Sequence, residues 1–173
     1  MGPSKYVPYH STLYIKTNSK FKTLTDNMTF LHNALGVAPF RRVWYEALNT
    51  LQELLWNDIF MRERFTTLGA AQFFRDLTAL WAVIDKYVVD GSASALGMPK
   101  LREAATLLNL PIASGDGVMS LRSAYERIFS DNAEAKKVVD ELGFSTITYH
   151  EARKILQSRV EASEYPCVIK APS

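Results

Sequence analysis

The segment 65–89 constrains the fold most, because its large apolar residues repeat at the spacing of a helix. These residues stand three and four positions apart and are Phe73, Phe74, Leu77, Leu80, Trp81, Ile84 and Val88. Such spacing places them along one side of an α-helix. The sequence therefore predicts a long amphipathic helix here, which Thr66 or Thr67 can cap at its start.

The four residues directly before this stripe are Gly69-Ala70-Ala71-Gln72. A glycine inside a helix costs about 1 kcal/mol relative to alanine, so a compensating contact is expected. We predict that a neighbouring helix approaches Gly69 and the two alanines closely. Gln72 would then be hydrogen-bonded at the seam between the two helices.

Two helical patterns precede this segment. The first covers about residues 23–35 and is expected to end at Gly36 in the left-handed conformation. The second is long, begins at Pro39 and continues to about Arg64, where Arg62 and Arg64 would complement the negative end of the helix.

About four shorter helices are expected to follow. Pro99 suits the first position of one helix, and Asp131 with Glu134 resembles a capping box that opens another. Thr148 with Glu151 is a full capping-box pattern. The sequence predicts an all-α fold, an elongated helical bundle in which two long helices precede about four shorter ones.

The domain organisation follows from where this periodicity starts and stops. Residues 1–20 contain prolines and no clear period, so they are predicted to form an irregular arm. Residues 21–162 are predicted to form the bundle, with a possible internal boundary in the small-residue loop 90–98. Residues 163–173 are expected to be a flexible tail.

Composition excludes several classes of protein. The net charge of +2 is close to neutral, which argues against a strongly electrostatic nucleic-acid or membrane-surface binder. The single cysteine, Cys167, allows no disulfide framework, and this fits a cytosolic protein. No run of eighteen apolar residues occurs, so any membrane association is expected to be peripheral.

No pattern of an enzyme or a cofactor site is found. His10, His32 and His150 lie in separate segments and lack the spacing of metal ligands. The loop 114–117 lacks the Lys-Ser/Thr of a phosphate-binding loop, and no serine stands in a nucleophile elbow. We therefore expect no catalysis, no metal, no cofactor and no small-molecule substrate.

One segment supports an alternative from another class. Residues 135–158 have the outline of a helix-turn-helix around Gly143. Its second helix would present Tyr149, His150, Arg153, Lys154 and Gln157, all of which can contact DNA. Val139 replaces the usual small residue of the first helix, and the chain lacks a basic stripe. A structural helical hairpin is the default interpretation, with a DNA-binding protein as the alternative.

The residues around the first feature also carry a family resemblance. Gly69, Ala70, Ala71, Gln72, Asp76 and Thr78 follow a Gly-Ala-Ala-Gln-x-x-x-Asp-x-Thr pattern. This pattern resembles the C-terminal region of the RINT/TIP family of vesicle-tethering subunits. The likeness extends over about residues 39–161, and residues 65–68 and 91–96 look most like fungal members. Arg75 stands where animal members tend to carry an aromatic residue.

The resemblance implies a non-enzymatic subunit of a Dsl-type tethering complex, with this chain corresponding to the C-terminal part of a longer protein. Such complexes act in retrograde transport from the Golgi to the endoplasmic reticulum, where they capture vesicles and support SNARE assembly. The implied partners are other tethering subunits and SNAREs, engaged by the full-length protein. The implied location is the cytoplasm, peripheral to the endoplasmic reticulum membrane, and the implied fold is a rod of stacked helical bundles.

Overall fold

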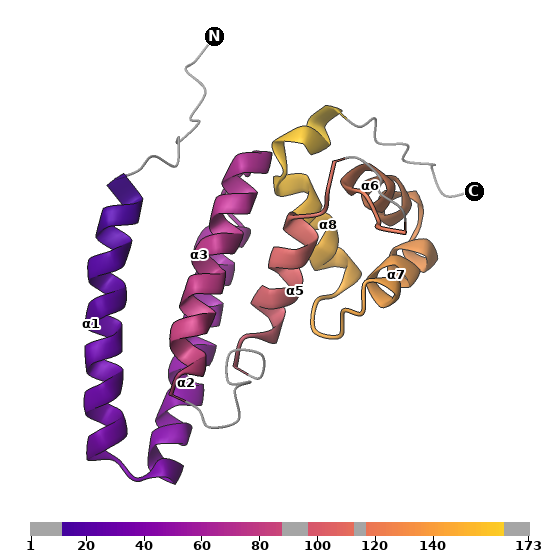
Figure 1. Ribbon diagram of the computed structural model, residues 1–173. Helices are drawn as coiled ribbons and strands as arrows, with labels where there is room; N and C mark the ends of the chain where they lie inside the picture. Colours follow the sequence, from indigo (N-terminus) through magenta and orange to yellow (C-terminus); the bar gives the residue numbers. More distant parts are fainter. Residues whose placement is uncertain (1–11, 88–96, 113–116, 165–173) are drawn as a thin grey trace.

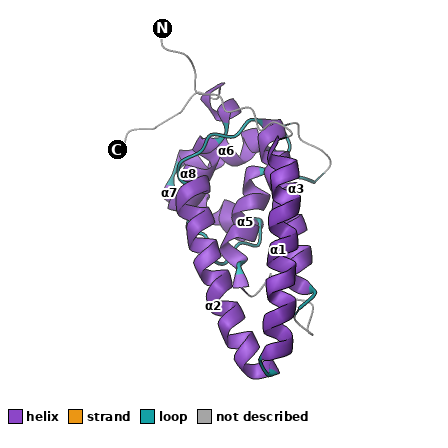
Figure 2. Ribbon diagram, turned by 90° about the vertical axis from the view of Figure 1, so that its left-hand side faces the viewer, coloured by secondary structure: helices purple, strands orange, loops and turns teal. Residues whose placement is uncertain are grey.

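The computed structural model describes residues 12–87, 97–112 and 117–164, and helices make up most of these ranges (Figures 1 and 2). No strand occurs within the described ranges, where Phe65 and Arg159 form an isolated parallel β-bridge. The predicted all-α fold is therefore confirmed for this part of the chain.

Three long helices come first. They are α1 (Thr12–Ala34), α2 (Val37–Leu55) with its π-helical continuation η1 (Trp56–Phe60), and α3 (Thr67–Asp85). In Figure 1, α3 lies between α1 and α5, with α2 behind it. Because α1 has 23 residues and begins at Thr12, residues 12–20 are helical and do not belong to an irregular arm. Three long helices, rather than the predicted two, therefore precede the shorter ones.

Four helices of ten residues each follow in the described ranges. They are α5 (Pro99–Leu108), α6 (Leu121–Ser130), α7 (Asn132–Glu141) and α8 (Tyr149–Ser158). A 3₁₀ turn, η2 (Val160–Glu164), extends the structure two residues past the predicted end of the bundle. These elements form a second group that packs against α3 through α5 (Figure 1).

Capping side chains fix the starts of the last two helices. Asp131 Oδ1 accepts a hydrogen bond from Glu134 N at 2.7 Å, which confirms Asp131 as the cap of α7. Thr148 and Glu151 bond reciprocally at the start of α8, so the predicted capping box is present. Between these helices, Gly143 has a φ of 72°, a conformation that glycine adopts without strain.

The connection from α1 to α2 differs from the prediction. Gly36 has a φ of −65° and a ψ of 163°, so it is not a left-handed residue that closes α1. It is instead the N-cap of α2, which begins at Val37, and Pro39 lies in the first turn. A proline fits there because the first N–H groups of a helix have no partner within it.

The second long helix ends earlier than its apolar period suggests. The apolar period predicts a helix that continues to about Arg64, but η1 ends at Phe60. Beyond that point Phe65 N donates to Ser158 O at 2.8 Å, and Phe65 O accepts from Val160 N at 2.9 Å. These long-range bonds hold the backbone extended, which a continuing helix could not accommodate.

The core is one cluster of buried apolar side chains that extends from Met28 to Ala162. The predicted stripe of α3 is confirmed by full burial of Phe73, Leu77, Trp81 and Ile84 and by partial burial of Phe74 and Leu80; Val88 lies outside the described residues.

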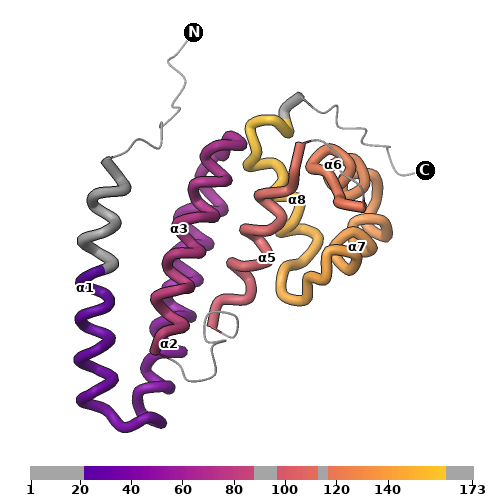
Figure 3. Tube along the Cα trace, viewed as in Figure 1, coloured from indigo at the N-terminus to yellow at the C-terminus, as the bar shows by residue number. Residues whose placement is uncertain are grey.

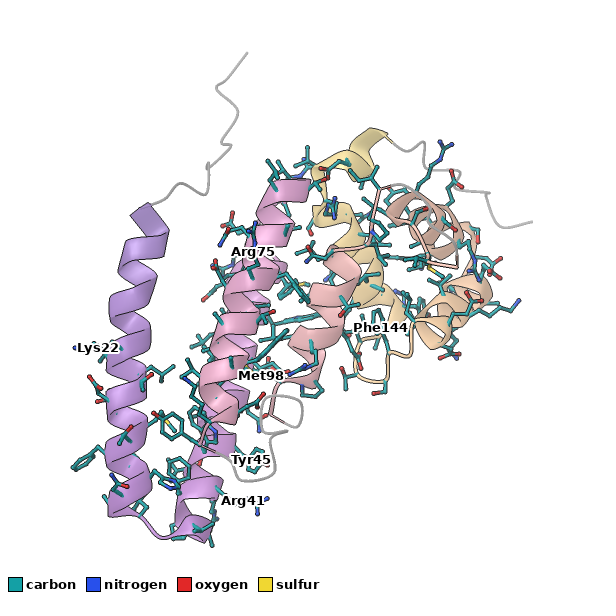
Figure 4. All side chains as sticks on the ribbon, viewed as in Figure 1. Lys22, Arg41, Tyr45, Arg75, Met98 and Phe144 are labelled. Atoms are coloured by element: carbon teal, nitrogen blue, oxygen red, sulfur yellow. The ribbon has the colours of Figure 1, made fainter. Side chains whose placement is uncertain are left out.

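The proposed internal boundary at 90–98 lies mostly outside the described residues. Its last two residues are part of the core. Met98 is fully buried at the start of α5 (Figure 4), and Gly97 lies directly against Leu48 of α2. Because the buried cluster includes residues from both sides of this segment, the two sides share one core.

Candidate functional site

The family-pattern residues lie in the first half of α3, and Gly69 has a local role there. Thr66 Oγ1 accepts a hydrogen bond from Gly69 N at 3.1 Å and thereby caps the helix. A Cβ at position 69 would lie 3.3 Å from this same oxygen and would meet no atom of another helix within 4 Å. The predicted approach of a neighbouring helix to Gly69 is therefore wrong. The small residue that faces the core is Ala70, which is fully buried, while Ala71 is half-buried.

The polar members of the pattern bond within α3. Gln72 Nε2 donates to Asp76 Oδ1 at 2.9 Å, one turn further along the helix. Thr78 Oγ1 donates to Phe74 O at 2.8 Å in the same way. The bond expected from Gln72 across a helix seam is thus an intrahelical one. Arg75 is exposed on the side of α3 that faces away from α5 (Figure 4).

A polar junction with a buried arginine at its centre lies directly beside these residues. The side chain of Arg159 is only 1% exposed, although it carries a permanent positive charge. Its guanidinium donates to Leu108 O, to Thr67 Oγ1 at 2.9 Å and to Glu161 Oε2 at 3.1 Å. These bonds matter because a buried charge is tolerated only when it is paired and hydrogen-bonded.

Glu161 completes this junction with its other carboxylate oxygen. Oε1 accepts from Thr67 N at 2.8 Å and from Thr67 Oγ1 at 2.6 Å. Burial by itself would raise the pKa of Glu161, but hydrogen bonds from Thr67 and Arg159 favour the ionised form and lower it to about 2. These bonds join η2 to the start of α3, and Figure 3 shows the two segments lying close together at the top of the molecule.

A second carboxylate joins α5 to the loop before α8. Glu103 accepts hydrogen bonds from the backbone N–H groups of Ser145, Thr146 and Ile147 at 2.8 to 3.1 Å. It also accepts hydrogen bonds from the side-chain hydroxyls of Ser145 and Thr146. Burial raises the pKa of Glu103, but these donors lower it by more, so the net shift is downward. The carboxylate acts as an ionised clamp on the loop.

The helix-turn-helix segment uses its main candidate residue internally. Arg153 Nε donates to Ile128 O at 2.9 Å, and its Nη1 donates to Asn132 Oδ1 at 2.9 Å. Its guanidinium also lies 5.3 Å from the ring centroid of Tyr149. Arg153 thus binds the end of α6 and the start of α7, and α8 packs against α5, α6 and α7. His150, Lys154 and Gln157 are exposed, but this geometry does not support α8 as a DNA-reading helix.

Metal ligands do not gather in the part of the chain that the structure describes, where no group of three or more His, Cys, Asp and Glu residues is placed to bind an ion. His32 is exposed and contacts the ring of Phe40 edge-on at 5.0 Å, while His10 and Cys167 lie outside the described residues. Among the described helices, none combines the length and apolar content that crossing a bilayer requires.

Comparison with known families places this bundle. A model of the RINT-1/TIP-1 family matches residues 8–159, which include all the pattern residues of α3. The chain belongs to the RINT-1/TIP-1 family. The match begins before residue 39, where the resemblance was expected to start, and so takes in α1. Neither the search of curated proteins nor that of solved structures gave a match.

Membership of the RINT-1/TIP-1 family indicates a domain of a vesicle-tethering protein that works together with other proteins. No pattern in the sequence predicted the junction around Arg159, which lies beside the family residues. Arg159 and Glu161 form an Arg-x-Glu sequence at a helix end, which occurs on any charged surface. Only the packing of Leu108 and Thr67 around Arg159 distinguishes it.

Proposed function

We propose that this chain is a non-enzymatic structural and interaction domain of a tethering-complex subunit in retrograde transport from the Golgi to the endoplasmic reticulum. The observation that carries the proposal is the family match over residues 8–159 on an all-α bundle. In the full-length protein the domain would support vesicle capture and SNARE assembly. Its partners would be other subunits of a Dsl-type complex and SNAREs, at the periphery of the endoplasmic reticulum membrane.

The hydrogen bonds and ion pairs between distant elements of the bundle support a scaffold role. A tether must hold its binding surfaces at fixed separations, so its helices must not slide past one another. Glu103 fixes the α7–α8 loop to α5, and Lys100 Nζ pairs with Glu151 at 2.7 Å to join α5 to α8. Arg159 connects α5, α3 and the end of α8. These bonds lie between elements that are distant in sequence and tie α3, α5, α8 and the loop before α8 together.

The same bonds argue for a non-enzymatic role. Catalytic carboxylates have perturbed pKa values because they sit in clefts and are poised to exchange protons with a substrate. Glu103 and Glu161 have lowered pKa values, but their carboxylates are occupied by backbone and side-chain donors of the fold. Lowered pKa values held by structural donors stabilise a fold, and these two carboxylates are therefore not poised for proton transfer to a substrate.

Affinity capture tests the proposal. The chain, immobilised as bait, is incubated with detergent-solubilised endoplasmic reticulum and cytosol from a fungus, and the bound proteins are quantified by mass spectrometry. We expect enrichment of tethering subunits or SNAREs over an unrelated helical bait of equal size. A second arm asks whether full-length protein lacking residues 12–164 still supports retrograde transport. Normal transport without the domain, or capture of chromatin proteins alone, would contradict the proposal.

A further inference from the structure

The connection between η1 and α3, together with the first turn of α3, exposes charged and apolar side chains in a regular order. Its sequence from 62 to 68 is Arg-Glu-Arg-Phe-Thr-Thr-Leu. Arg62 and Arg64 stand five and three residues before Thr67, and Leu68 directly follows it. All four residues are exposed, and Leu68 has 79% of its surface accessible. An apolar side chain this exposed is available for a pocket of another protein.

The position of the two arginines in the sequence suggested that they complement the negative end of a helix, but they lie outside the helix. Because η1 ends at Phe60, Arg62 and Arg64 lie beyond the helix, in the connection to α3. Arg62 pairs with Asp58 at 3.3 Å, with both side chains more than half exposed. A surface ion pair of this kind is weak and opens readily. Both guanidinium groups can therefore reach a partner that approaches this connection.

This order of side chains is complementary to the peptide groove of a basophilic protein kinase. Such a kinase selects substrates by charge, with acidic pockets for arginines before the acceptor hydroxyl and an apolar pocket for the residue after it. We propose that Thr67 is a phosphorylation site for a basophilic serine/threonine kinase, and that its phosphate opens the junction between α3 and η2. The proposal stands independently of the transport function.

The chemistry is a phosphoryl transfer from Mg-ATP. The Thr67 hydroxyl oxygen bonds to the γ-phosphorus as the bond from that phosphorus to the β–γ bridging oxygen breaks. The hydroxyl proton passes to the kinase base and then to solvent, and ADP leaves. The acceptor is accessible because the first turn of a helix bonds its N–H groups outside the helix. For the segment to extend, the junction bonds and the cap must open, and the buried ring of Phe65 must leave its contacts with Phe60 and Phe73.

Thr67 is placed where a phosphate changes the structure. Its Oγ1 donates to Glu161 Oε1 at 2.6 Å and accepts from Arg159 Nη2 at 2.9 Å. Phosphorylation removes this donor and adds about 1.5 to 2 negative charges. Glu161 is already ionised, so two anions would meet at hydrogen-bond distance. Arg159 would pair with the phosphate, while Glu161 would be expelled together with η2.

The adjacent Thr66 gives an internal comparison. Its hydroxyl accepts a hydrogen bond from Gly69 N and caps α3. The hydrogen bonds to Arg159 and Glu161 come from Thr67 instead. The arginines stand at positions −4 and −2 relative to Thr66, outside the preferred register. Phosphate on Thr66 instead of Thr67 would therefore contradict the proposal.

The first experiment identifies the acceptor. The full chain is incubated with Mg-ATP and a purified kinase that prefers arginine at −5 and −3, and the phosphosite is mapped by mass spectrometry. We expect one phosphate on Thr67, none in Thr67→Val, and at least tenfold slower incorporation in Arg62→Ala/Arg64→Ala. The matched control Arg41→Ala/Arg42→Ala, an exposed arginine pair at the start of α2, should react at the wild-type rate. Equal rates in both double variants would overturn the proposal.

The second experiment measures the opening. In the phosphorylated chain we expect faster amide exchange at Phe65 and Val160, whose N–H groups bond across the junction, and a lower melting temperature. Glu161→Gln removes the second anion, so phosphorylation should lower its melting temperature by less than half as much. Unchanged exchange and melting temperature after stoichiometric phosphorylation of Thr67 would refute the opening.

Discussion

Replacing Gly97 by alanine should destabilise the fold, because the added methyl group has no space. A Cβ at position 97 would lie 2.5 Å from Leu48 Cδ1, 3.0 Å from its Cβ and 3.3 Å from its Cγ. Leu48 is only 1% exposed. Its Cβ is fixed to the α2 backbone and cannot rotate away, so relief of the contact requires a shift of α2 relative to the start of α5.

The magnitude follows from two opposing terms. Overpacking a core by a methylene-sized group costs about 1–3 kcal/mol. Replacing glycine by alanine also restricts the unfolded chain, which returns about 0.4–1 kcal/mol. The net loss in the free energy of unfolding for Gly97→Ala should therefore be about 1–2 kcal/mol. For a chain of this length the melting temperature should fall by about 2–8 °C.

Urea denaturation followed by circular dichroism measures this loss at constant m-value. Gly36→Ala is the matched control, since its Cβ would have Pro39 Cδ as the nearest atom, at 3.9 Å, and φ at Gly36 is −65°. Because alanine caps a helix less well than glycine, it should lower the free energy of unfolding by about 0.5–1 kcal/mol, and since this loss involves no contact with Leu48 it should add to that of Leu48→Ala. The Leu48→Ala/Gly97→Ala double variant should be more stable than the sum of the single effects by about 0.5 kcal/mol or more. Additive effects, or wild-type stability of Gly97→Ala, would refute the close contact.

Three further outcomes are expected. The pKa of Glu161 is about 2 in the folded state against 4.5 for a free carboxyl, so its contribution to the free energy of unfolding is present above pH 4.5 and is lost as pH falls towards 2. In acid titrations, the free energy of unfolding of Glu161→Gln should therefore fall less steeply over that window than that of the wild type. Arg153→Ala should lower the free energy of unfolding by about 1–3 kcal/mol, whereas exposed Lys154→Ala should stay within about 0.5 kcal/mol, and equal values from urea titrations would contradict the internal role of Arg153. Gly69→Ala should change stability by less than about 1 kcal/mol by thermal melting, because gained helix propensity offsets crowding of the Thr66 hydroxyl, and a larger loss would show a packing contact there.

Local patterns predicted much of the fold. The stripe of α3 and the caps at Thr66, Asp131 and Thr148 depend on residues within one or two turns, and the structure confirms all of them. Long-range contacts produced the errors. The end of η1 depends on bonds from Phe65 to the end of α8, which no periodicity in α2 could reveal.

The glycines show the same limit for the candidate site. Gly69 stood out because it begins the family pattern, but it fits a local cap. Gly97 looked like an ordinary loop residue, yet it makes the close approach that was expected at Gly69. A close approach depends on which helix packs opposite, so it cannot be derived from the residue and its neighbours in sequence. The pattern identified the family correctly without giving the physical role of its first residue.

The bonds that join residues 65–67 to residues 158–161 have a consequence for synthesis of the chain. Thr67 and Phe65 bond to partners about ninety positions later, so almost the whole domain must leave the ribosome before the junction at the start of α3 can form. Closing a loop of that length is slow compared with forming local helices. Until α5 has emerged, the faces of α2 and α3 that it covers remain open to solvent. We therefore expect the nascent chain to depend on chaperones until η2 has emerged from the ribosome.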